Sequence, residues 1–229
     1  MIVVENRDEL KELINQRVRE QGPNCDLNDI DVSGIRDMSY MFAGSKFKGD
    51  ISAWDVSNVK NMENMFNSSS FDGDISNWNV SYVKNMDSMF CNSRFKGDIS
   101  RWDVSRVEDM ADMFWNSKFN NDISQWDVSS VRDMSHMFTN SKFNKDISSW
   151  DVSSVEDLNC MFAWSVFNKD ISSWDVSNVR NMNYMFSKSK FRGDLSKWNT
   201  SKVEQSLHIF NGSPLEGKEP EWCKQIQES

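Results

Sequence analysis

The sequence predicts an α/β repeat solenoid with one short parallel strand and one short helix in every 24-residue unit. The first observation is a tryptophan that recurs at every twenty-fourth residue, namely Trp54, Trp78, Trp102, Trp126, Trp150, Trp174 and Trp198. A fixed period of this length indicates stacked units that bury their apolar side chains against their neighbours. The second observation is that each unit contains two different apolar spacings. The third is that segments without the repeat flank the array, as capping segments do.

The first apolar segment of each unit predicts the strand. In the unit of residues 50–73, DISAWDVSNVKNMENMFNSSSFDG, the side chains of Ile51, Trp54 and Val56 follow the L-x-x-L-x-L spacing of leucine-rich repeats. In such repeats this spacing forms a short strand that pairs in parallel with its neighbours. We therefore expect a strand over residues 53–56 and at the equivalent residues of every unit.

The second apolar segment predicts the helix. Val59, Met62, Met65 and Phe66 recur at steps of three and four, which is the apolar stripe of a helix that lies on a core. We expect this helix over residues 58–67. The methionines fall on the stripe, so they are interpreted as core residues and not as metal or haem ligands.

The ends of the chain differ from the repeat and predict caps around a single structural domain. Residues 1–24 combine a short apolar segment with a charged helical segment, Arg7 to about Gln21, and are expected to form a cap of strand and helix. Residues 25–212 form the repeat array, and residues 213–229 are expected to cover its last open edge.

The repeat resembles a known family. The pattern DISxWDVSxVxxMxxMF, with xSxFxxD between units, is similar to the BspA-like leucine-rich repeats of bacterial surface proteins and mycoplasma-type lipoproteins over about Cys25 to Gly212. The resemblance implies a leucine-rich-repeat-like fold, protein binding and a location at the cell surface. The N-terminal residues themselves lack the basic segment and apolar run of an export signal, so taken alone they predict a cytoplasmic protein.

Composition and motifs give no support for catalysis, a cofactor or a metal site. The two histidines, His136 and His208, stand in unrelated contexts without a recurrent nucleophile. No glycine-rich phosphate loop, CxxC pair or calcium-loop motif occurs. The cysteines are interpreted as reduced thiols, and they are Cys25, Cys91, Cys160 and Cys223.

The charge balance favours a basic protein partner. The chain has 26 basic and 35 acidic residues and a formal net charge of -9. Long-range attraction to nucleic acid or to an anionic membrane is therefore not expected. The oligomeric state stays open.

Three sets of outward residues are candidates for partner binding, and each has a structural alternative. Carboxylates that follow the repeat tryptophan could bind a partner or could bond to the neighbouring serine, and these are Asp103, Asp127, Asp151 and Asp175. The residue before that tryptophan varies between units, as at Arg101 and Gln125. This variation could reflect recognition of a partner, or neutral drift at an exposed position. Trp115 and Trp164 replace small or polar residues and could anchor a partner or cover neighbouring side chains.

These observations favour a non-catalytic scaffold that binds a macromolecular partner through a rigid repeat surface. Two alternatives remain. The rows of carboxylates could imitate nucleic acid and inhibit a DNA- or RNA-handling protein. The chain could also be an adhesin whose export signal is absent from this sequence.

Overall fold

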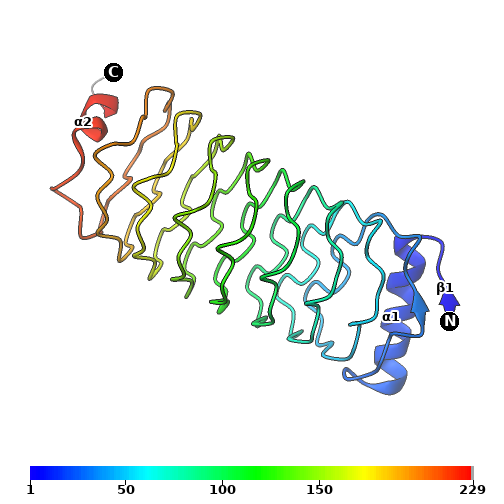
Figure 1. Cartoon of the computed structure of the whole chain (residues 1–229). Helices are drawn as coiled ribbons and strands as arrows, with labels where there is room; N and C mark the ends of the chain where they lie inside the picture. The colour runs from blue at the N-terminus through cyan, green and yellow to red at the C-terminus, as the bar shows by residue number, and fades with distance from the viewer. Residues whose placement is uncertain (228–229) are drawn as a thin grey trace.

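The computed structural model describes residues 1–227 as an elongated stack of coils, one coil for each repeat unit (Figure 1). The helix α1 covers one end of the stack and the helix α2 lies at the other end. The chain is therefore a repeat protein whose coils follow the 24-residue period of the sequence.

The N-terminal cap combines a parallel strand pair with α1. The strand β1 (Ile2–Val3) pairs in parallel with β2 (Ile30–Asp31), which belongs to the first coil. The helix α1 (Arg7–Gln21) begins after Asn6, whose side chain accepts hydrogen bonds from two first-turn amides. It buries Leu10 and Ile14, so its apolar face closes the first coil.

The repeat units consist of turns, and the predicted strand and helix are wrong. Within residues 22–220 the structure contains one named strand, β2, and no helix. Residues 53–56 form no strand, because the backbone turns between Ile51 and Trp54 and between Val56 and Val59. Parallel pairing between units occurs instead as single bridges further along, where Asn61 meets Asn85 and the equivalent pairs follow up to Asn181 and Gln205.

Left-handed residues prevent a helix over residues 58–67. Asn64 and Ser68 have φ values of 56° and 55°, and their equivalents in the other units repeat this conformation. Every second amide therefore points along the stack: Asn64 N donates to Asp87 O at 2.8 Å and Phe66 N to Met89 O at 2.9 Å. The intervening amides close turns to the carbonyl three residues earlier, as Met65 N does to Met62 O. An α-helix would direct all of them to the carbonyl four residues earlier.

The successive turns explain the apolar spacing that suggested a helix. Each turn advances the chain by three residues, so Val59, Met62 and Met65 all enter the core. Aromatic rings then stack from coil to coil, with centroids 5.6 Å apart between Phe66 and Phe90. The repeat tryptophans add a hydrogen bond between coils, because each indole N–H donates to a carbonyl 27 residues earlier, as in Trp126 to Ile99 at 3.0 Å.

The C-terminal cap extends the tryptophan column by one residue. The helix α2 (Glu221–Gln227) contains Trp222, which follows Trp198 by 24 residues. The Trp222 ring stacks 6.2 Å from that of Trp198, and its N–H donates to Leu195 O at 2.8 Å. Residues 228 and 229 of the predicted cap lie outside the described residues.

Replacing Trp222 by alanine should lower the free energy of unfolding by about 2–4 kcal/mol, because it removes a buried ring and a buried hydrogen bond at the end of the stack. Denaturant unfolding followed by fluorescence measures this change. Lys224→Ala, an exposed change in the same helix, is the control and should have little effect. A loss below about 1 kcal/mol for Trp222→Ala would show that α2 does not act as a cap.

Candidate functional site

The predicted carboxylates lie exposed in one column and also bond within the chain. Asp103 Oδ1 accepts hydrogen bonds from the backbone amide of Ser105 at 3.1 Å and from its hydroxyl at 2.6 Å. Asp127, Asp151 and Asp175 accept the amide of the serine two residues later in the same way. These bonds, the serine hydroxyl first, lower the pKa of the Asp103 carboxyl, and those of Asp151 and Asp175 fall for the same reason. The column thus has a structural role, and the carboxyls of Asp103, Asp151 and Asp175 stay ionised at neutral pH.

The variable residues before the tryptophans also lie on the surface. Arg101 is exposed and, with Ser76, Asn77 and Asp98, lines a small pocket of about 70 Å³. Gln125 is exposed one unit further on, and its side chain reaches Ser124 Oγ at 3.4 Å. Neither residue is held in a defined constellation with the other predicted residues.

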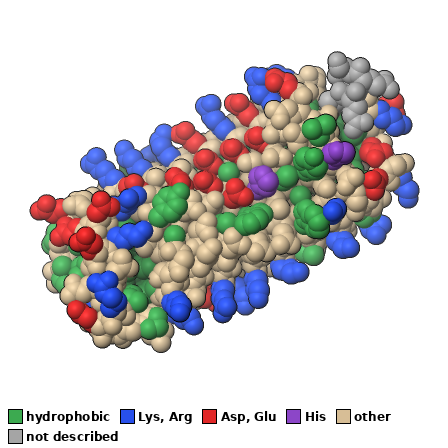
Figure 2. Space-filling model, turned by 180° about the vertical axis from the view of Figure 1, so that it is seen from behind, with side chains coloured by type: hydrophobic (Ala, Val, Ile, Leu, Met, Phe, Trp, Pro, Cys, Tyr) green, Lys and Arg blue, Asp and Glu red, His purple; other side chains and the backbone are tan. Residues whose placement is uncertain are grey.

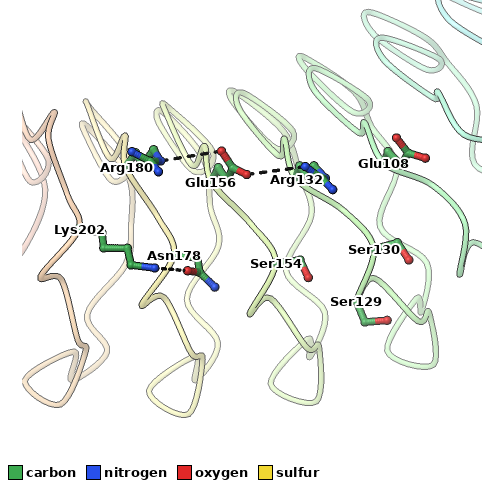
Figure 3. Close-up of a pocket in the computed structure, with 9 residues that line it drawn as sticks. All are labelled: Glu108, Ser129, Ser130, Arg132, Ser154, Glu156, Asn178, Arg180 and Lys202. Atoms are coloured by element: carbon green, nitrogen blue, oxygen red, sulfur yellow. Dashed lines mark hydrogen bonds and ion pairs between the residues drawn. The ribbon is translucent and has the colours of Figure 1, made fainter.

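A polar groove of about 540 Å³, which we call the central groove, crosses several consecutive coils (Figure 3). One of its rows alternates in charge along the stack through Glu108, Arg132, Glu156 and Arg180. Glu156 lies between two arginines, at 4.0 Å from the Arg132 guanidinium and 3.9 Å from that of Arg180. These side chains are well exposed, so the ion pairs orient them more than they stabilise the fold.

The second row of the central groove lies at the position of Asn58 in each coil, and small residues in this row leave the space of the groove. The equivalents of Asn58 are Tyr82 and Arg106 on one side, whose side chains stack at 4.5 Å, and Ser130 and Ser154 in the middle. On the other side Lys202 Nζ donates to Asn178 Oδ1 at 2.6 Å. The two serines leave the hollow, which offers hydroxyls, cations and carboxylates to a polar ligand.

The residues equivalent to 61–68 form a second surface, which we call the turn face. Trp164 is 57% exposed there, and Leu207 and Tyr184 are 61% and 39% exposed. The Tyr184 ring lies 5.3 Å from the His208 ring, and the backbone amide of Tyr184 donates to Leu207 O. We call Trp164, Tyr184 and Leu207 the apolar patch. Large apolar side chains gathered on a surface are typical of protein-binding sites.

Trp164 lies on this surface in an unfavourable conformation. Its φ is 59°, at a position where the sister units have Asn, Ser, Lys or Gly. The Lys188 ammonium lies 4.1 Å above its ring. Trp115, the other predicted aromatic, lies on the turn face two units earlier and is partly buried.

An acidic patch adjoins the apolar patch on the turn face, and it consists of Glu63, Asp87, Asp109, Asp112 and Asp133. Figure 2 looks onto this face: acidic side chains gather toward the middle of the stack, and hydrophobic ones around the histidine nearer the C-terminal end. Burial raises the pKa of the carboxyls of Asp87, Asp109 and Asp112, and neighbouring carboxylates add to the rise.

Sequence reasoning missed most of these residues. It identified Trp115 and Trp164, and weighed Tyr184 in the same way, but not Leu207, the acidic patch or the central groove. The groove could have been found from Ser130 and Ser154, which are small residues in a column that otherwise contains larger side chains.

The described residues, 1–227, contain no cluster of three or more histidine, cysteine or acidic side chains that could hold a metal ion. Among the same residues, no helix has the length and apolar character needed to cross a membrane.

Coils, stacked aromatic columns and caps define this chain as a repeat protein. Residues 10–123 and 115–222 each match the family described as "Mycoplasma protein of unknown function, DUF285". The matches cover most of the chain, which therefore belongs to this family. Comparison with curated proteins and with solved structures gives no match.

Replacing Asp109 by asparagine should stabilise the protein at neutral pH. The folded pKa of Asp109 is raised, so folding favours its protonated form, and its ionised form destabilises the fold as the pH rises through this pKa. Asparagine keeps the bond to the amide two residues later, as Asn61 does. We expect the Tm to rise by about 1–3 °C at about pH 7 and the gain to vanish toward about pH 4.

Thermal unfolding across this pH range measures the effect. Asp175→Asn is the control, because the pKa of Asp175 is lowered and its replacement should bring no gain at neutral pH. If Asp109→Asn raised the Tm equally at every pH, or lowered it at neutral pH, the ionised Asp109 carboxyl would not be the group that destabilises the fold.

Proposed function

We propose that this protein is a non-catalytic scaffold that binds a protein partner through the turn face. The observation that carries the proposal is the apolar patch, because Trp164, Tyr184 and Leu207 are exposed on a framework that buries its repeat tryptophans and phenylalanines almost completely. Among residues 4–224, whose burial the structure describes, the exposed large apolar side chains are these three with Tyr40 and Tyr82. All but Tyr82 lie on the turn face.

The framework favours binding because it is held in place before a partner arrives. Each coil is joined to the next by repeated backbone hydrogen bonds and by stacked rings, as in the pairs Asn64 to Asp87 and Phe66 to Phe90. Little conformational entropy is then lost at the interface on binding.

The partner is proposed to be a basic protein. The acidic patch precedes the apolar patch along the turn face, where Asp112, His136, Cys160 and Tyr184 occupy the same position in four successive coils. A partner segment with apolar side chains followed by lysine or arginine would complement both patches.

Two alternatives rest on other features. The exposed and ionised column of Asp103, Asp151 and Asp175 favours an inhibitor that imitates nucleic acid. An adhesin at the cell surface, with BspA-like binding through leucine-rich-repeat-type coils, is the function that the mycoplasma-type family would favour.

Matched asparagine variants separate the first two functions. In the variant Trp164→Asn, Tyr184→Asn and Leu207→Asn, each residue becomes one that sister units contain at that position. Capture of partner proteins from lysate should fall at least about tenfold, because the interface anchors are removed. Quantitative mass spectrometry of the captured proteins measures the change.

The comparison variant changes Asp103, Asp127, Asp151 and Asp175 to asparagine, the residue found in the same column at Asn79 and Asn199. Asn79 and Asn199 accept the same serine amide, so the fold should be kept. The scaffold predicts that this variant retains its partners. Loss of capture here, with retention in the apolar-patch variant and a steep fall with salt, would instead support the nucleic-acid-mimicking inhibitor.

A further inference from the structure

The return segment of each coil forms a third surface with two rows of opposite charge. In the segment 117–123, Lys118, Asn120 and Asp122 are exposed while Phe119 and Ile123 are buried, so the exposed three point to one side. No turn interrupts this segment. We call the surface of these outward positions the return face.

The first row of the return face is basic in most coils and is interrupted at Ser70 and Val166. It occupies the position of Lys118 in each coil, and its cations are Lys46, Arg94, Lys118, Lys142 and Lys190. All five side chains are exposed.

The third row is acidic in every coil and occupies the position of Asp122, with the members Asp50, Asp74, Asp98, Asp122, Asp146, Asp170 and Asp194. Each accepts the amide of the serine two residues later, as Asp122 does from Ser124 at 2.9 Å. These bonds, with a smaller contribution from Lys145, lower the pKa of the Asp122 carboxyl, so it is ionised at neutral pH.

The two rows cannot neutralise one another within one chain. Lys118 and Asp122 are four residues apart along an extended segment, a distance of about 13 Å. None of the five cations forms an ion pair within the described residues, and neither does any carboxylate of the acidic row. Both rows are left with unpaired charges.

The middle row separates them and is nearly neutral at its centre. The Asn144 backbone amide donates to Asn120 Oδ1 at 2.9 Å, and the Asn168 amide donates to Asn144 Oδ1 at the same distance. These asparagines are therefore tied to the neighbouring coil and present no charge to a surface that approaches them.

We propose that the return face is a self-complementary interface at which two copies of this chain associate side by side. A two-fold axis parallel to the stack and along the middle row places the basic row of each copy over the acidic row of the other. Lys118 then faces Asp122 of the second copy, and Asp122 faces Lys118 of that copy, as an isologous interface requires.

The repeat itself supplies the match between the two copies. Both rows have one position per coil, so their charges share one spacing along the stack, with gaps in the basic row at Ser70 and Val166. A second copy has this spacing automatically, whereas any other charged partner would have to reproduce it over several coils. The pairs are exposed and individually weak, so the association depends on several of them and on ionic strength.

Sedimentation velocity of the full chain, over a range of concentrations at low ionic strength, tests the interface. The unmodified protein should show a monomer–dimer equilibrium, and Lys118→Glu with Lys142→Glu should weaken dimerisation at least about tenfold. The control, Arg36→Glu with Lys60→Glu, gives the same net charge by changing two exposed cations outside the return face. It should leave dimerisation unchanged.

Complementary charge reversal provides the sharper test. Asp122→Lys with Asp146→Lys should weaken dimerisation to a similar extent, and mixing this variant with the Lys118→Glu, Lys142→Glu variant should restore a heterodimer. Circular dichroism establishes that both variants are folded. Should the Asp→Lys pair not fold, Asp122→Asn with Asp146→Asn keeps the amide acceptors and must weaken dimerisation.

Three results would overturn the proposal. The unmodified chain could remain monomeric at its highest soluble concentration. The return-face variant and its control could weaken dimerisation equally, which would assign the effect to net charge alone. The folded complementary variants could fail to associate when they are mixed.

Discussion

The amides that point along the stack are the interaction on which the rest of this structure depends. They can point in that direction only because the backbone enters the left-handed region twice in each coil, at Asn64, Ser68 and their equivalents. This conformation is unfavourable for most residues, and glycine, asparagine and aspartate tolerate it best. Its cost is offset because every second amide then finds a carbonyl in the next coil, and the stacked rings follow in register.

Because the backbone bonds and the inward side chains hold the coils together, the outward side chains are free to vary. The inward columns stay almost entirely apolar, and some keep a single residue type, as the phenylalanines equivalent to Phe66 do, while the outward columns can change in one coil without disturbing the next. Ser130 and Ser154 open a groove in this way, and Trp164 adds an exposed ring. The stack therefore presents several parallel surfaces, each with its own charge and polarity.

Sequence reasoning predicted the repeat, its period and the buried residues, because tryptophan and phenylalanine recur without exception at the core positions. It also placed the N-terminal helix at Arg7–Gln21, where α1 lies. It failed inside the unit, because turns that advance by three residues bury the same side chains as a helix would. Asn64 and its equivalents were the missed signal, since residues that tolerate positive φ recur there.

The candidate surfaces were predictable only in part. Trp164 differs in kind from its sister residues, so its exposure could be expected. The acidic patch combines residues from three different positions of the repeat, and only the geometry of the turns brings Asp87, Asp109 and Asp112 together. Through-hydrogen-bond NMR couplings test the central claim about these turns. The account predicts a coupling from the Asp112 amide to the Ser135 carbonyl carbon, and from Phe114 to Met137. Couplings from these amides to the carbonyl four residues earlier in the same coil would show a helix and contradict it.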